Sequence, residues 1–260
     1  DLFAGIGGMR LPFQELNGEC KFSSEWDRFA IKTYAANFGE LAKGDITKIS
    51  SDQIPSHDVL LAGFPCQAFS QAGLKRGFSD TRGTMFFEIQ RILAEKQPKA
   101  FLLENVKQLK GHDKGKTLKT ILEILRGDSK PNIPADYPIS DEVRKSMSKR
   151  LNYAVDFRVL KANNFGVPQK RERIYIVGFN RDYFQDSKSL EIKIQEMFVD
   201  LEDKKSITKL GDILENKYSI DPKYTISDRL LAGHIRRRKE HKIKGNGFGY
   251  SLFNEDSPFC

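Results

Sequence analysis

The amino-acid sequence predicts an α/β protein in which a sheet carries helices on its faces. Short apolar segments alternate with helix-like segments over residues 1–180, which is the pattern of a sheet assembled from strand and helix units. A chain of 260 residues is long enough to bury one large core and a second small one. After residue 180 the alternation fades into charged sequence, so we expect a second, smaller domain to begin there.

The individual elements follow from the spacing of apolar residues. Runs that are typical of strands lie at 20–24, 58–64, 99–106, 153–160 and 173–179. Segments that are typical of helices lie at 11–18, 27–39, 83–97 and 116–127, the last with apolar residues at 118, 121, 122 and 125. Residues 127–150 contain three prolines and many polar residues, and we expect an inserted loop with a short helix there.

Composition excludes several classes of protein. The mean hydropathy is -0.51, and apolar runs such as residues 59–64 are far too short to cross a bilayer. The three cysteines form no CxxC pair and the four histidines are isolated, which disfavours a disulfide framework and a structural zinc site. We therefore expect no metal. Because no export signal is visible, we expect a cytoplasmic protein.

Positive charge is concentrated towards the C-terminal end. The chain has a net charge of +8, and residues 229–244 alone contribute +6, with seven basic residues and one acidic residue. A basic run of this kind suits a polyanion such as nucleic acid. A solvated helix face has the same composition, so the run alone does not decide between the two.

Three polar segments follow predicted strands near the start of the chain. The glycines within residues 1–8 come between a strand end and a helix, where they let the backbone approach a nucleotide closely. Glu25 ends the next strand, where an acid accepts hydrogen bonds from ribose hydroxyls, and Trp26 can stack on an adenine ring. Asp45 is available to an amino group. An ordinary tight turn and a core tryptophan remain the alternatives.

Three further segments contain reactive or charged residues. Cys66 follows an apolar strand and a proline, although an inert buried thiol has the same pattern. Glu104 ends another apolar strand, and a carboxylate in that position needs a partner or a function. Arg171 and Arg173 precede a strand at alternating spacing. Surface ion pairing with Glu172 is the alternative for either arginine.

Six motifs in this order resemble the cytosine-C5 DNA methyltransferases of bacterial restriction-modification systems. They are DLFAGIGG (1–8), EW (25–26), GDI (44–46), GFPCQAFS (63–70), ENV (104–106) and QKRER (169–173). The resemblance implies a Rossmann-like, S-adenosylmethionine-dependent methyltransferase sheet. It further implies that residues 1–180, with an insert at 127–150, form the catalytic and cofactor-binding domain. Residues 181–260 would then be a linker and the start of a smaller domain that recognises the DNA target.

The same resemblance implies a role for each matching residue. Cys66 would add to C6 of a flipped cytosine, Glu104 would bind N3 and the exocyclic amine, and Arg173 would donate to O2. Arg171 and Asn105 would support them. Contacts to S-adenosylmethionine are implied for Phe3, Gly5, Ile6, Gly7, Glu25, Trp26, Asp45, Ile46, Phe64 and Pro65. Contacts to double-stranded DNA are implied for Gln67, Ser70, Arg82, Arg236, Arg237 and Arg238.

Two features differ from the family pattern. The first strand of the family starts earlier than DLF, and its later motifs do not appear before Cys260. We therefore expect a fragment of a longer enzyme, acting as a monomer or with a complementing C-terminal chain. A DNA- or cofactor-binding fragment without turnover is one alternative. Methylation of cytosine in tRNA is the other, although the Pro-Pro-Cys and Cys-Phe-Thr motifs of that branch are absent.

Overall fold

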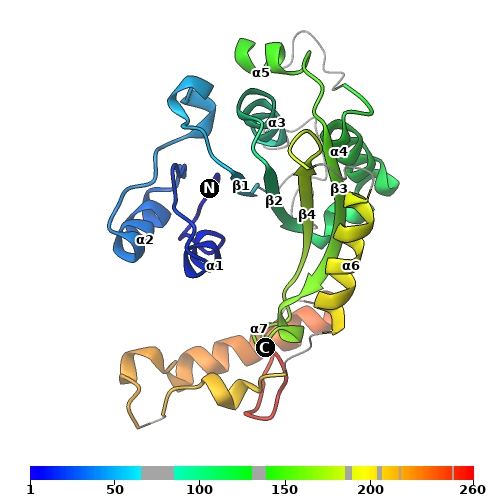
Figure 1. Ribbon diagram of the computed structural model, residues 1–260. Helices are drawn as coiled ribbons and strands as arrows, with labels where there is room; N and C mark the ends of the chain where they lie inside the picture. Colours follow the sequence, from blue (N-terminus) through cyan, green and yellow to red (C-terminus); the bar gives the residue numbers. More distant parts are fainter. Residues whose placement is uncertain (66–84, 131–138, 185–188, 204–206, 217, 248) are drawn as a thin grey trace. The chain divides into compact units, whose positions relative to one another are not determined.

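The protein divides into two compact units. The computed structural model describes residues 1–65, 85–130, 139–184, 189–203, 207–216, 218–247 and 249–260, apart from the side chains of 202 and 203 (Figure 1). The first unit contains Asp1–Leu160 and Glu172–Asp203, and the second contains Lys161–Arg171 and Lys204–Cys260. The candidate catalytic and cofactor residues that the structure describes lie in the first unit, except for Arg171.

A mixed sheet forms the centre of the first unit. It contains β1 (Val59–Gly63), β2 (Ala100–Val106), β4 (Glu172–Asn180) and β3 (Tyr153–Lys161), in that spatial order. β1 is parallel to β2, whereas β4 is antiparallel to β2. Beyond β1, single parallel bridges join Ala62 to Leu2, Leu2 to Ser24 and Ser24 to Lys43. The predicted α/β sheet is confirmed.

The strand expected at residues 20–24 is wrong in its length. Only Ser24 makes a bridge, in this case to both Leu2 and Lys43. The backbone hydrogen bonds to the two neighbouring segments are made by Ser23 and Ser24: the Ser24 amide donates to the Asp1 carbonyl oxygen at 3.0 Å, and the Lys43 amide donates to the Ser23 carbonyl oxygen at 2.8 Å.

The first five of seven helices lie close to predicted positions in the part of the chain that the structure describes. The seven are α1 (Arg10–Glu15), α2 (Arg28–Phe38), α3 (Met85–Lys96), α4 (Lys116–Arg126), α5 (Asp141–Ser146), α6 (Leu190–Asp203) and α7 (Asp228–Ile243). The side chain of Asp27 accepts hydrogen bonds from two amides at the start of α2, and Gly39 ends this helix in the left-handed conformation. α5 is the short helix expected within residues 127–150. The spacing of apolar residues did not predict α6. Ile192 and Val199 are apolar but exposed, so they obscure the spacing of the apolar residues on the buried face of this helix.

Alternating residues of the sheet face two apolar clusters. On one face, Tyr153 and Ile176 belong to the main core, which also contains buried residues of α3 and α4. On the other face, Ala154 and Val177 pack with the buried stripe of α6. This period of two places helices on both faces, as the sequence predicted.

A buried arginine joins α3 to the loop that follows Lys43. Arg91 is 1% exposed, although it lies within an apolar helix. Its guanidinium donates to Glu88 Oε2 (2.9 Å), Ser51 Oγ (2.7 Å) and the carbonyl oxygens of Ile49 (3.0 Å) and Ile46 (3.3 Å). Because a buried guanidinium is tolerated only when its donors are satisfied, this network fixes the course of the loop.

Helix α5 completes the network from the insert. Glu142 Oε1 lies 3.3 Å from the Arg91 guanidinium and accepts a hydrogen bond from the Ser51 amide at 2.8 Å. Burial opposes ionisation of Glu142, but the bonds to Ser51 and the charge of Arg91 outweigh it and lower its pKa. The insert is therefore tied to the core by a charged contact.

Replacing Arg91 with Met is expected to lower the free energy of unfolding by about 3–5 kcal/mol, because buried Glu88 would lose its counter-charge. Urea denaturation measures this loss. Lys149→Met is the matched control, since it breaks the more exposed ion pair with Glu95, and a loss below about 1 kcal/mol is expected. Equal losses in the two variants would contradict the proposed importance of the network.

The Arg91→Met variant should also show a distinct pH dependence. Burial raises the pKa of Glu88 even beside Arg91, and removal of the guanidinium raises it further. A carboxyl with a higher pKa in the folded state binds more protons when folded, so stability falls as the pH rises above the unfolded pKa. The variant should therefore regain part of its lost stability between about pH 7 and about pH 5.

Candidate active site

Four neighbouring strand ends place the predicted cofactor residues along one edge of the first unit. The parallel bridges put Lys43, Ser24, Leu2 and Ala62 side by side. The candidate residues follow these positions directly, in the segments 3–7, 25–26, 45–46 and 64–65. Carboxyl ends of adjacent parallel strands are where open α/β sheets bind ligands.

The glycine loop has a conformation that requires glycine. Gly7 has a φ of +93°, and the space where a Cβ would lie is already occupied by the Phe38 ring. Gly5 has a φ of +55° and open space at the same position, which leaves room for a ligand against the backbone. Asn37 Nδ2 donates to the carbonyl oxygen of Ile6 at 3.0 Å. Helix α2 therefore holds the loop in place, and the sequence pattern gave no sign of this.

Glu25 connects the glycine loop to the next strand end. Its Oε2 accepts a hydrogen bond from the Gly5 amide at 2.8 Å, and its Oε1 accepts from the amides of Trp26 and Asp27, both at 2.8 Å. A carboxylate has about four acceptor positions, so Oε2 can still accept a ligand hydroxyl. The Trp26 side chain is 69% exposed, which excludes the core tryptophan that was the alternative.

The remaining cofactor candidates differ in what they present. Asp45 Oδ1 accepts hydrogen bonds from the amide and hydroxyl of Thr47, while its other oxygen lies 3.7 Å from Lys48 Nζ. Ile46 and Phe64 are 3% exposed and belong to the main core, so they can present only backbone atoms to a ligand. Phe3 has a φ of 54° and is half-buried.

The antiparallel register of β2 and β4 brings Glu104 and Arg173 together. Val106 is paired with Arg173, and Glu104 is paired with Tyr175. The side chains of both pairs therefore lie on one face, with Glu104 diagonal to Arg173. Arg173 Nε lies 2.8 Å from Glu104 Oε1, and the two side chains are 23% and 20% exposed. The expected partner of Glu104 is thus Arg173, in a position that a ligand can reach.

Asn105 points to the opposite face and holds the neighbouring strand end. It is 1% exposed, and its Nδ2 donates to the Phe64 carbonyl oxygen at 3.2 Å. On the neighbouring strand Gly63 pairs with Glu104, and a Cβ at Gly63 would lie 3.6 Å from Glu104 Oε2. The chain that leads into Cys66 therefore starts beside the carboxylate of Glu104. Cys66, Gln67, Ser70 and Arg82 themselves lie outside the described residues.

Arg171 does not lie on the strand that contains Arg173. β4 begins at Glu172, so the strand does not extend to the alternating positions before it. Arg171 belongs to the second unit, where its carbonyl oxygen accepts from the Ala162 amide at 2.9 Å. Glu172 is the acid that was considered as a surface partner for either arginine. It forms an ion pair with Lys107.

The predicted DNA-binding arginines lie on α7 in the second unit. No side chain of this helix is fully buried, and Arg236, Arg237 and Arg238 are exposed. Arg236 Nε lies 3.7 Å from Glu240 Oε1, and the Arg238 guanidinium lies 5.1 Å from the centroid of the Tyr250 ring. The helix thus presents a basic surface to solvent.

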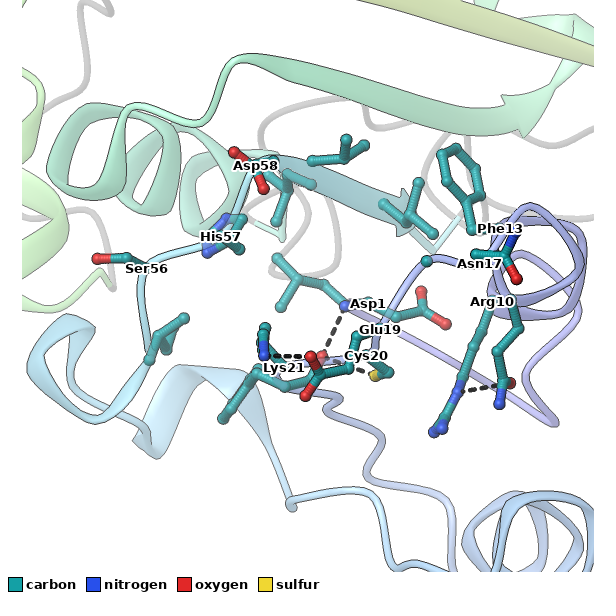
Figure 2. Close-up of a pocket in the computed structure, with 18 residues that line it drawn as sticks. Asp1, Arg10, Phe13, Asn17, Glu19, Cys20, Lys21, Ser56, His57 and Asp58 are labelled. Carbon is teal, nitrogen blue, oxygen red and sulfur yellow. Dashed lines mark hydrogen bonds and ion pairs between the residues drawn. The ribbon is translucent and has the colours of Figure 1, made fainter.

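A cavity of about 450 Å³ lies away from these residues. Its walls include residues 20–22, Asp58 and His57, which come before Ser24 and β1 rather than after them (Figure 2). Burial lowers the pKa of His57 below the usual value of a histidine. None of the catalytic or cofactor candidates that the structure describes lines the cavity.

Among the described residues, no group of three or more His, Cys, Asp or Glu side chains is placed to hold a metal ion. No helix in this part of the chain is long and apolar enough to cross a membrane.

Comparison with known proteins identifies the family. The family described as C-5 cytosine-specific DNA methylase matches residues 1–128 and 140–258. The chain is 49% identical over 260 residues to the type II methyltransferase M.DsaV of Dactylococcopsis salina, covering 100% of this chain and 64% of that protein. It is 53% identical over 260 residues to M1.ScrFI of Lactococcus lactis subsp. cremoris, covering 100% of this chain and 58% of that protein.

A solved structure supports the same fold at lower identity. The Dnmt2 methyltransferase of S. pombe superposes with a TM-score of 0.62 at 17% identity, covering 99% of this chain and 68% of that one. The fold is that of an S-adenosylmethionine-dependent methyltransferase. The chain belongs to the C-5 cytosine-specific DNA methylase family, as its motifs predicted. It spans about six tenths of the length of the curated relatives described above.

Proposed function

We propose that the protein from which this chain comes methylates C5 of cytosine in double-stranded DNA. The observation that carries the proposal is the contact between Glu104 and Arg173, beside the chain that leads into Cys66. At this separation the carboxyl group can bind N3 and the exocyclic amine of a cytosine. The guanidinium can donate hydrogen bonds to O2 of the same base. This pair therefore matches the edge of a cytosine that has left the duplex stack.

The proposed chemistry divides between the thiol and the pair. C5 of cytosine is a poor nucleophile, so the Cys66 thiolate adds to C6 and the electrons of the 5,6 double bond move towards C5 and N3. Glu104, in its protonated form, donates its proton to N3, where negative charge develops, and Arg173 donates hydrogen bonds to O2. Once C5 is methylated, a water molecule acting as base takes the C5 proton, the electrons of that C–H bond re-form the 5,6 double bond, the thiolate leaves C6, and the N3 proton returns to Glu104.

S-adenosylmethionine, when bound, supplies the methyl group that C5 attacks. The open backbone at Gly5, the remaining acceptor capacity of Glu25 and the exposed ring of Trp26 fit the methionine, ribose and adenine parts of this molecule. Asp45 retains an oxygen for the adenine amino group. These residues would hold the cofactor at the sheet edge from which the chain leads into Cys66.

Helix α7 is proposed to bind the DNA backbone. Its exposed arginines supply the charge, and the aromatic contact of Arg238 with Tyr250 orders the segment that follows. The part of the chain beyond residue 203 is thus proposed to bind the duplex, whereas the first unit performs the chemistry.

Trapping the enzyme on DNA tests the proposal directly. A duplex with 5-fluorocytosine at the target blocks loss of the C5 substituent, so the full-length protein should form a stable covalent adduct that a denaturing gel resolves. Cys66→Ala should form no adduct while it still binds S-adenosylhomocysteine. Methyl transfer to tRNA but not to duplex DNA would favour the RNA-acting alternative. An adduct with Cys66→Ala would refute the assignment of the nucleophile.

Glu104→Gln is expected to slow methyl transfer by a factor of about 100 or more, the usual effect of removing one preorganised acid or donor. Single-turnover measurements with saturating DNA isolate this step. Binding of S-adenosylhomocysteine should not change, since Glu104 faces the base. A transfer rate equal to that of the wild type would contradict the proposed role.

Replacing Arg236, Arg237 and Arg238 with Ala should weaken DNA binding and flatten its salt dependence. Each phosphate contact contributes about 0.9 to the slope of log K against log salt, so loss of three contacts removes up to about 2.7. Fluorescence anisotropy over a range of salt concentrations measures the slope. An unchanged slope would show that α7 is a solvated helix face.

A further inference from the structure

The first unit carries a second concentration of positive charge. Residues 107–119 contain five lysines and one aspartate, a net charge of +4 without the histidine. Lys107 is paired with Glu172, and Lys119 Nζ lies 3.8 Å from Glu123 Oε1. The three others, Lys110, Lys114 and Lys116, are exposed and make no ion pair with any residue that the structure describes. We refer to these three as the lysine surface.

The lysine surface is connected directly to the catalytic pair. The turn η4 (Lys107–Gly115) begins where β2 ends, and Lys110 is only six residues from Glu104. Six residues of extended chain span at most about 22 Å, which is less than one helical turn of duplex DNA at about 34 Å. The ion pair of Lys107 with Glu172 also ties η4 to the residue before Arg173.

The backbone that carries the lysines is held in place by contacts with the core. Leu109 is fully buried in the main core, and His112 Nδ1 lies 2.7 Å from the hydroxyl oxygen of Thr117. α4 begins at Lys116, immediately after the turn, and buries an apolar face in the same core. The lysine side chains therefore extend into solvent from a fixed backbone.

Folding alone does not account for these lysines. Lys114 follows Asp113 in the left-handed region, with φ values of 55° and 46°, a conformation that costs energy for residues other than glycine. Lys116 is the first residue of α4, whose first turn contains no acidic side chain. Positive charge at the amino end of a helix opposes the helix dipole. Both features lower the stability of the folded protein when it is alone. An anionic partner bound at the lysines would offset the unfavourable electrostatic interaction with the helix dipole.

Duplex DNA fits this surface better than other anions do. A base held at Glu104 remains joined to its own strand, so backbone phosphates must lie on either side of it, within the reach established above for Lys110. Lysines bind phosphates as flexible point charges and do not require a defined base edge. An acidic protein or an anionic membrane has no such reason to lie next to the base-binding pair.

We propose that the lysine surface binds backbone phosphates of the DNA next to the target cytosine, so that the first unit contributes its own electrostatic contact besides α7. This inference rests on the proposed function, because it takes the base at Glu104 and Arg173 as given. It assigns Lys110, Lys114 and Lys116 to holding the strand near the flipped nucleotide.

The test compares two triple variants of the full-length protein. Lys110, Lys114 and Lys116 are changed to Gln in one, and the exposed Lys32, Lys130 and Lys145 are changed to Gln in the other, with equal loss of charge. The first should reduce the salt slope of DNA binding by up to about 2.7, whereas the second should leave it unchanged. Equal affinity for S-adenosylhomocysteine in both confirms that the first unit remains folded.

Replacing single backbone phosphates with uncharged methylphosphonates locates the contact between the lysine surface and the DNA. Methylphosphonates placed one at a time within three nucleotides of the target cytosine should weaken binding by the wild type but not by the Lys110, Lys114 and Lys116 variant. An unchanged salt slope in that variant would overturn the inference, while methylation and α7-dependent DNA binding would leave the proposed function intact. Loss of binding to polyglutamate or anionic vesicles, but not to the duplex, would also overturn it. Failure of the wild type to bind or methylate any duplex would instead refute the proposed function.

Discussion

The antiparallel pairing of β4 with β2 is the constraint on which the candidate site depends. In a sheet that was parallel throughout, the start of β4 would lie at the far end from Glu104, and Arg173 would be separated from it by the length of the strand. The observed register instead pairs Val106 with Arg173 and places the guanidinium 2.8 Å from the carboxylate. A slip of one residue would turn Arg173 to the opposite face.

Successive side chains of β2 point to opposite faces of the sheet and have different roles there. Glu104 is directed to the solvent-accessible face with Arg173, while Asn105 is buried and bonds the end of β1. The network around Arg91 has a comparable role, because it fixes the loop that follows Lys43. Buried polar contacts of this kind hold a site rigid because each leaves an expensive unpaired group if it breaks.

Sequence reasoning identified the residues at the strand ends but not the contacts that hold them. The glycines, Glu25 and Glu104 were found because a polar residue after an apolar strand is a local pattern. The direction of β4 was not, since no local pattern distinguishes an antiparallel strand from a parallel one when the crossover is long. The role of Arg91 could not be predicted from the sequence, because its acceptors at Ile46, Ile49 and Ser51 lie at least 40 residues away.

The contact between Gly7 and the Phe38 ring has a consequence for how this sequence can change. The ring occupies the space where a Cβ at position 7 would lie, and the Arg10 guanidinium lies 4.2 Å from the centroid of the same ring. A residue other than glycine at position 7 would need both a smaller residue at position 38 and a backbone φ of +93°, so position 7 should remain glycine. Positions 10 and 38 should instead vary together during divergence, because a smaller residue at position 38 removes the ring against which the Arg10 guanidinium packs.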